Sequence, residues 1–248
     1  MPRILHQFAS SHFNEKARWA LDWKGLEYER VTYLPGPHVP AIKKLSGQSS
    51  TPVLEWDGEI VAGSAAIVDH LERLQPEPSL YPADPAERAK ALDVQRHFDA
   101  EVGPAVRAAL FSVLLREGAY FSRVFTKGKG SLTSGFYRAT VPLARKLISQ
   151  SYGLDDAAKV EADFARTQDA LDRLAKEVRE TGHVVGERFS VADLAAASLL
   201  APLVRLEHPD MARPAPVPDA IARFEERWAA HPAIAWVRDV YARHRPVR

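Results

Sequence analysis

Segments with the pattern of β-strands occur only before residue 62 of this 248-residue chain. Residues 3–8, 28–33, 53–56 and 59–61 are short and rich in Val, Ile, Leu and aromatic side chains, as half-buried strands are. Everything after Asp84 is rich in Ala, Leu, Arg and Glu and is helical in character. This distribution predicts a small α/β unit followed by a larger all-helical one.

Helical segments separate the predicted strands. Between residues 13 and 21, apolar side chains recur at the i, i+4, i+7 and i+8 spacing of a helix that ends at Gly25. A proline-rich loop over 34–40 precedes a short helix over 41–45, and a third helix covers 64–74. The resulting order, β-α-β-(α)-β-β-α, is that of a thioredoxin-like domain.

A proline-rich stretch follows the third helix and predicts a boundary between two domains. We expect a thioredoxin-like domain over 1–76, a linker over 77–84 and an all-helical domain over 85–248. Residues 127–135, rich in Gly, Lys and Ser, are expected to be a mobile loop between two helices.

The composition excludes several kinds of chemistry. The chain has no cysteine, so disulfides, thiolate metal sites and cysteine nucleophiles are excluded, and any thiol must come from a ligand. A net charge of +1, from 33 basic and 32 acidic side chains, provides no field to attract nucleic acid. No run approaches the ~18 apolar residues needed to span a membrane, and polar groups interrupt the N-terminus too early for a signal peptide. We therefore expect a soluble, cytoplasmic protein.

Ser10 and Ser11 stand between the first strand and the first helix. A helix N-terminus offers unpaired N–H groups and the positive end of the helix dipole, so it favours an anion. A serine hydroxyl there can donate a hydrogen bond to a thiolate. Lowering a thiol pKa by about two units takes about 2.7 kcal/mol, which a hydroxyl and a helix terminus can supply. Either serine can also be a plain N-cap, and the local pattern alone favours that interpretation.

The start of the third predicted strand and the start of the third predicted helix could also hold a peptide-like ligand. Pro52 stands between Thr51 and a strand that begins at Val53, and a cis bond would leave Val53 on a free strand edge. A trans proline is the commoner state. Gly63-Ser64 opens the third helix, where amides and a hydroxyl could receive a carboxylate or simply form a cap.

In the helical region, Ser190 and Asp193 precede an apolar run over 194–200. This pattern is a capping-box variant, with Asp in place of Glu, and it indicates the start of a buried helix. We assign it no catalytic role.

Four segments, in this order, resemble the glutathione transferase superfamily, in its theta-, zeta- and phi-like bacterial or fungal members of the serine type. Ser11 followed by KARWAL resembles the serine-plus-RVRIAL opening, and LSG followed by TPVL at 51–54 resembles the segment LNP…VPVL, whose proline is cis in the family. GSAAI at 63–67 with DHLE resembles ESxAIxxYLE, and SVADL at 190–194 resembles the family's helix start in the second domain.

The resemblance implies a role for each matching residue. Ser11 would stabilise the glutathione thiolate, with Ser10 as the alternative, and Val53 would hold the cysteinyl backbone. Ser64 would hold the γ-glutamyl carboxylate and His38 the glycyl carboxylate. Gly63 stands where most relatives have Glu or Asp, so one anchor of the γ-glutamyl group is missing. The implied glutathione-binding set is Ser11, His38, Thr51, Pro52, Val53, Gly63 and Ser64.

The resemblance also implies a homodimeric detoxification enzyme that conjugates glutathione to an apolar electrophile, without a metal. We expect the second substrate on aromatic residues of the interdomain region, each of which could instead be a core residue: Phe13, Phe98, Phe111, Tyr120 and Phe121. Two alternatives stay open. One is a non-catalytic protein-interaction module with a degraded glutathione site, and the other is a glutathione-dependent peroxidase, isomerase or ether-cleaving enzyme.

Overall fold

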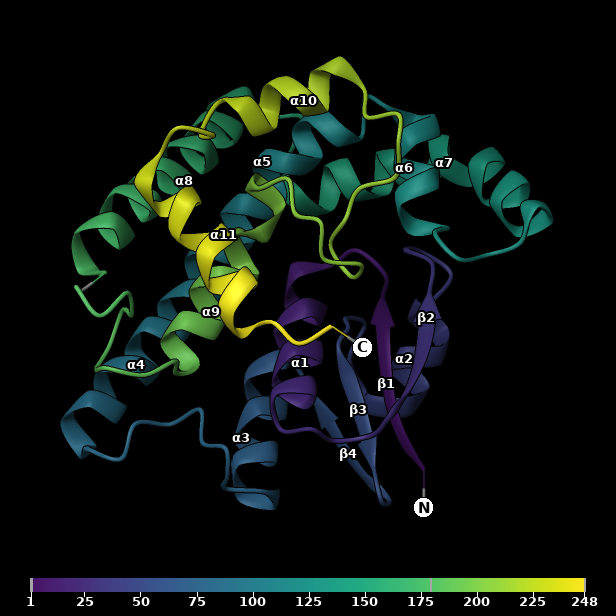
Figure 1. The fold of residues 1–248 in the computed structure, drawn as a ribbon. Helices are drawn as coiled ribbons and strands as arrows, with labels where there is room; N and C mark the ends of the chain where they lie inside the picture. The colour runs from purple at the N-terminus through teal and green to yellow at the C-terminus, as the bar shows by residue number, and fades with distance from the viewer. Residues whose placement is uncertain (1, 179, 248) are drawn as a thin grey trace.

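The N-terminal part of the computed structural model, which describes residues 2–178 and 180–247, is a sheet with helices on both faces (Figure 1). The outer limits of the two expected domains, residues 1 and 248, lie outside this range. The described strands form one four-stranded sheet in the order β2-β1-β3-β4, with β1 and β2 parallel and the other pairs antiparallel. The elements are β1 Arg3–Phe8, α1 His12–Trp23, β2 Glu29–Tyr33, α2 Val39–Ser46, β3 Val53–Trp56, β4 Glu59–Ala62 and α3 Ser64–Leu74. This confirms the predicted thioredoxin-like order.

The β3–β4 hairpin follows from its turn residues. Asp57 and Gly58 both have positive φ, 51° and 100°, which matches the twist of a tight hairpin. The bond between Thr51 and Pro52 is cis, as the resemblance to the family predicts. The expectation of a free strand edge at Val53 is wrong. Strand β3 lies inside the sheet, where Val53 pairs with His6 of β1 and with Ala62 of β4.

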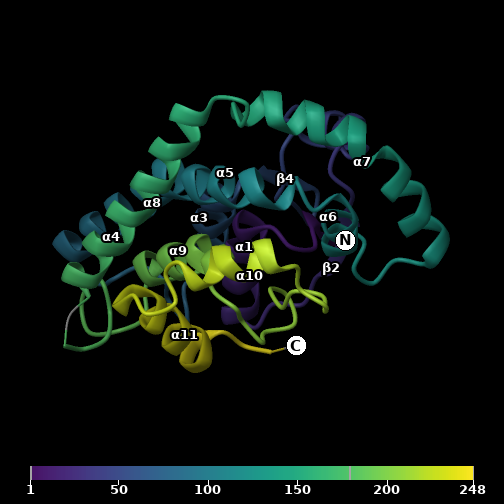
Figure 2. The same cartoon turned by 90° about the horizontal axis from the view of Figure 1, so that it is seen from above.

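The helical part arches over the sheet, as Figure 1 and the view from above in Figure 2 show. A π-helical turn over Phe98–Val102 joins its first two helices, and a short 3₁₀ turn over Ala201–Leu203 follows the sixth. The helices are α4 Pro85–His97, α5 Gly103–Leu114, α6 Gly118–Phe125, α7 Ser131–Tyr152, α8 Ala157–Glu177, α9 Val191–Leu200, α10 Asp219–Glu226 and α11 Pro232–His244. No helix in the described ranges is long and apolar enough to cross a membrane.

Two predicted loops are shorter than expected. The loop over 127–135 ends at Gly130, because α7 already begins at Ser131. The loop over 34–40 ends at His38, because α2 begins at Val39 with Pro40 in its first turn, where a proline costs no hydrogen bond.

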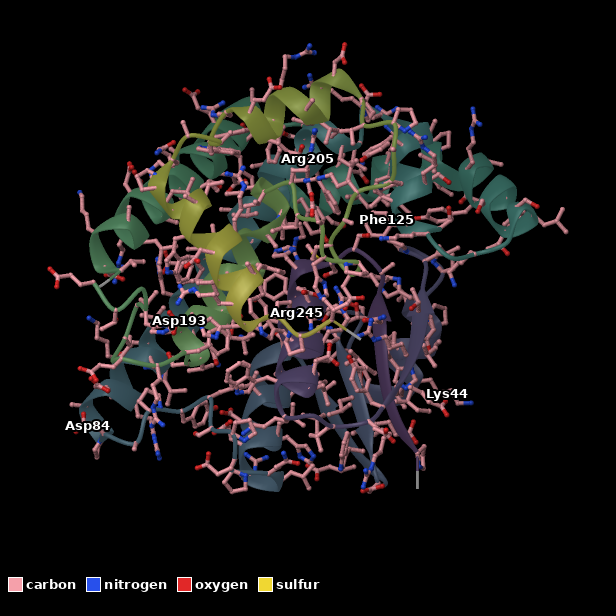
Figure 3. The ribbon with its side chains drawn as sticks, viewed as in Figure 1. Lys44, Asp84, Phe125, Asp193, Arg205 and Arg245 are labelled. Atoms are coloured by element: carbon pink, nitrogen blue, oxygen red, sulfur yellow. The ribbon has the colours of Figure 1, made fainter. Side chains whose placement is uncertain are left out.

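The core is continuous between the two parts of the chain. Helix α9 is buried along its whole length and packs against α1 of the N-terminal domain. The predicted capping box at its start is confirmed: the Ser190 hydroxyl accepts from the Ala192 N–H, and Asp193 Oδ2 accepts from the Ser190 N–H at 2.9 Å. Asp193 is labelled in Figure 3. Because the apolar interface is shared, we expect the two domains to hold a fixed mutual orientation.

Helix α1 carries charged side chains on its buried face. Glu15 and Arg18 are completely buried and paired at 2.8 Å, and Asp22 is nearly so. Arg245, which follows α11 and is labelled in Figure 3, binds Glu15 at 2.8 Å and Asp22 at 2.7 Å. We call this group of three arginines and three carboxylates the α1 ion cluster; its members are Glu15, Arg18, Asp22, Arg30, Asp210 and Arg245.

Candidate functional site

A cavity of about 360 Å³ lies where the N-terminus of α1 meets the helical domain. The N-terminal domain contributes polar groups to its wall, and the helical domain contributes mostly apolar ones. The polar and charged lining residues are Ser10, Ser11, His12, His38, Ser49, Ser50, Thr51, Arg107, Ser151, Tyr152 and Arg213, and the apolar ones include Phe8, Phe13, Leu110, Phe111, Leu114, Val124, Phe125, Ile148, Pro202 and Met211. A wall divided in this way suits a ligand with one polar and one apolar part.

The two serines at the start of α1 differ in their hydrogen bonds. Ser11 occupies the N-cap position, but its side chain makes no capping bond and has no hydrogen-bond partner among the described residues. The Ser10 hydroxyl donates to the carbonyl of Val124 at 3.3 Å. The Ser11 hydroxyl is therefore the one available to a ligand, next to the unpaired N–H groups of a 12-residue helix.

His12 is a structural residue of the cavity floor. Its Nε2 lies 3.0 Å from the carbonyl of Gly103 in α5. Burial, and then the positive charge of Arg107, lower the pKa of His12 to about 3, so the ring is neutral and Nε2–H donates to this carbonyl. Gly103 leaves no room for a side chain, because a Cβ there would stand 2.8 Å from the Phe13 ring. This close approach seats the first turn of α1 against α5.

His38 lines the cavity, but both ring nitrogens are engaged. The N–H of Gly36 donates to Nδ1 at 3.1 Å, so Nε2–H donates to the carbonyl of Ser49 at 3.0 Å. Burial lowers the pKa of His38, which keeps the ring neutral near pH 7. The predicted contact with a glycyl carboxylate would require the bond to Ser49 to break.

Thr51, just before the cis proline, lines the cavity together with the preceding Ser49 and Ser50. Its hydroxyl accepts a hydrogen bond from the side-chain amide of Asn14 at 3.2 Å, so α1 also fixes this segment. Pro52, Val53, Gly63 and Ser64 do not line the cavity. Gly63 has a φ of 96°, a left-handed conformation that favours glycine, and the buried Ser64 begins α3 directly after it.

Both halves of the chain match family profiles. Residues 5–79 match the profile of the glutathione S-transferase N-terminal domain, and residues 140–232 match that of the C-terminal domain. The chain belongs to the glutathione transferase superfamily.

Curated relatives match the chain over part of their length. A glutathione S-transferase of Pseudomonas putida is 33% identical over 95 residues, which are 38% of this chain and 43% of that protein. A maleylacetoacetate isomerase of Pseudomonas aeruginosa is 32% identical over 120 residues, 46% of this chain and 57% of that protein. The match thus spans about half of these relatives' length. A glutathione S-transferase structure from Methylobacterium radiotolerans, in complex with glutathione sulfonate, has a TM-score of 0.56 at 21% identity and covers 100% of this chain and 96% of its own.

The aromatic residues predicted for a second-substrate pocket divide into two groups. Phe13 and Phe111 line the cavity. Phe98, Tyr120 and Phe121 are core residues with at most 4% exposure, so their assignment to the pocket is wrong. Hydrophobic spacing marks the apolar face of a helix, but it cannot distinguish a face turned to the core from one turned to a cavity.

Most of the helical wall of the cavity was not predicted from the sequence. Phe125 at the end of α6, labelled in Figure 3, and Tyr152 at the end of α7 both line it. Arg107 was also missed, although it is the one charged residue of α5 and could have been noticed for that reason. Among the described residues, no group of three or more His, Cys, Asp or Glu side chains could hold a metal ion.

Proposed function

We propose that this transferase binds glutathione in the interdomain cavity and that Ser11 stabilises the glutathione thiolate. The observation that carries the proposal is the contrast between the two serines: the Ser10 hydroxyl is bound to Val124, and the Ser11 hydroxyl is unpartnered among the described residues. A hydroxyl donor and the N-terminus of α1 both favour a negative charge at this point. The glutathione sulfonate complex of the related structure supports glutathione as the ligand.

The reaction that we propose is attack of the thiolate on an electrophilic small molecule held by the apolar wall. Phe13 and Phe111 would contact that molecule, with Leu110 and Phe125 beside them. The protein would contribute deprotonation and positioning, with no covalent bond to the chain. We further propose that the enzyme is a cytoplasmic homodimer that functions in detoxification, by analogy with its superfamily.

A glutathione-dependent isomerase is the second candidate, because several curated relatives are named maleylacetoacetate isomerase or probable maleylacetoacetate isomerase. An isomerase would use the same thiolate, but it would release the glutathione at the end of each cycle. The two reactions differ in stoichiometry: conjugation consumes one glutathione per turnover, and isomerisation consumes none.

Measurement of the thiolate absorbance of enzyme-bound glutathione against pH tests the role of Ser11. We expect Ser11→Ala to raise the apparent pKa of the bound thiol and to reduce turnover near pH 7, with a smaller effect on glutathione affinity. Ser10→Ala is the matched control and should leave the titration unchanged. A shift in Ser10→Ala alone would move the role to that residue, and an unchanged titration in both variants would leave the helix terminus as the activating group.

A further inference from the structure

Arg107 is a cation in the cavity wall without a carboxylate partner in the described part of the chain. It is the one charged residue of α5, and no described carboxylate lies within ion-pair distance of it. Its Nε is buried and has no hydrogen-bond partner. A buried donor of this kind costs free energy until something accepts from it, and a charged one costs more.

Aromatic rings hold the Arg107 head group in place. Its guanidinium carbon lies 4.5 Å from the centre of the Tyr152 ring and 5.6 Å from that of Phe13. Such contacts orient a guanidinium but do not neutralise it. Arg213, the other arginine of the cavity wall, is different, because it is paired with Glu225 at 2.5 Å. Arg107 is therefore positioned and still able to pair.

The remaining charges of the cavity leave Arg107 uncompensated. No Asp or Glu is among the residues that line the cavity in the described part of the chain. The two lining histidines, His12 and His38, are neutral near pH 7, because burial lowers the pKa of each. The cavity therefore presents a single free positive charge beside an apolar wall.

We propose that Arg107 binds a carboxylate of the second substrate, so that the electrophile is an apolar or aromatic acid rather than a neutral molecule. The inference rests on the proposed function. A guanidinium offers two parallel N–H donors that fit a carboxylate, and one cation balances one carboxylate, whereas a phosphate dianion would call for a second. Arg107 belongs to the helical half of the wall, with Phe111 and Tyr152, and not to the thioredoxin-like half proposed for glutathione.

Two product analogues test the proposal by calorimetric titration: S-(4-carboxybenzyl)glutathione and its neutral methyl ester. We expect the parent enzyme to bind the acid at least about tenfold more tightly than the ester, which corresponds to about 1.4 kcal/mol for a half-buried charged hydrogen bond. Arg107→Met should remove this preference and leave the affinity for the ester nearly unchanged. Arg116→Met removes the same charge from an exposed residue just beyond α5 and should keep the preference.

The other outcomes would overturn the proposal in distinguishable ways. The role of Arg107 would be refuted if the parent bound acid and ester with equal affinity, or if Arg107→Met still preferred the acid. Either result would leave the proposed function untouched. If Arg107→Met weakened the binding of unsubstituted glutathione as much as it weakened the binding of the acid analogue, the arginine would be assigned to glutathione itself. If the parent bound neither analogue nor glutathione, the proposed function would fail and this inference with it. Should Arg107→Met not fold, Arg107→Lys, which lacks the forked donors, should still reduce the preference severalfold.

Discussion

Arg245→Met should destabilise the protein strongly at neutral pH. The Arg245 side chain is completely buried and donates three charge-assisted hydrogen bonds, to Glu15 at 2.8 Å, to Asp22 at 2.7 Å and to Asp210 at 2.8 Å. The α1 ion cluster balances three arginines against three carboxylates. Without Arg245, one buried carboxylate has no counter-charge.

The magnitude follows from that imbalance. Removing one partner of a buried ion pair costs about 3–5 kcal/mol, because the remaining charge stays desolvated without compensation. In a chain of this size, that loss lowers the melting temperature by roughly 6–20 °C. Methionine fills most of the volume of the arginine stem, so a lost packing contact contributes little to the difference.

The pH dependence identifies the mechanism. Burial alone would raise the pKa of Glu15, but Arg245 and Arg18 together outweigh it, so the pKa lies below its usual value. The pKa of Asp210 is lowered in the same way, because Arg18, Arg30 and Arg245 outweigh its burial. A carboxyl whose folded-state pKa is depressed stabilises the protein above its unfolded-state pKa of about 4 and loses that contribution as the pH falls. The difference in free energy of unfolding between the parent and Arg245→Met should therefore be largest near pH 7 and become smaller below about pH 4.

Urea denaturation of the parent and the variant between pH 3.5 and pH 8, followed by circular dichroism, measures this deficit. Arg243→Met is the control, because Arg243 is paired on the surface with Asp239, with side chains 40% and 55% exposed. Arg243→Met should lower the free energy of unfolding by less than about 1 kcal/mol. The reasoning would be refuted if Arg245→Met lowered the free energy of unfolding by less than about 1 kcal/mol at pH 7, or if this difference from the parent did not become smaller in acid.

Three further predictions concern the site and the assembly. Gly103→Ala should destabilise by about 1–3 kcal/mol in urea denaturation, because its Cβ would press on the Phe13 ring at 2.8 Å and on the backbone oxygen of Phe98 at 3.1 Å; a variant as stable as the parent would contradict the close packing. The family resemblance implies that the γ-glutamyl carboxylate binds beyond the cavity wall, at Ser64 at the start of α3, so Ser64→Ala should weaken glutathione binding about ten- to hundredfold in calorimetry; an unchanged dissociation constant would mean that this group binds elsewhere. Light scattering should give twice the 27.5 kDa of one chain, and a mass of one chain would exclude the homodimer.

The thioredoxin-like domain could be predicted closely because its signals are local. Asp57-Gly58 determines a hairpin through its own backbone preferences, and β1 has the bounds that its apolar run predicts, Arg3–Phe8. The strand edge at Val53 could not be predicted in the same way. Which neighbours a strand has depends on the order of the whole sheet, and β4 occupies the side of β3 that was expected to be free.

The helical wall of the cavity was predicted least well, and Phe98 and Phe111 show why. Phe98 lies in the short mixed segment FDAEV, and Phe111 lies in α5, which is apolar on almost every side, so the spacing around neither residue indicates which face meets the core. The structure turns Phe98 into the core and Phe111 into the cavity. This choice is made by the packing of α5 between α8, α9 and α10, which involves residues far away in the sequence.

Helix α1 connects the stability of the protein to its proposed chemistry. Its first turn presents Ser11 to the cavity, and the Glu15 N–H, one turn later, donates to the Ser11 carbonyl at 2.8 Å. The side chain of the same Glu15 is bound by Arg18 and Arg245. Buried ion pairs contribute little net stability compared with apolar residues of the same volume, but the elements that carry them can pack in few other ways without leaving a buried charge unpaired. The α1 ion cluster therefore fixes the position of the helix terminus, and a fixed terminus is what a hydroxyl needs in order to stabilise a bound thiolate.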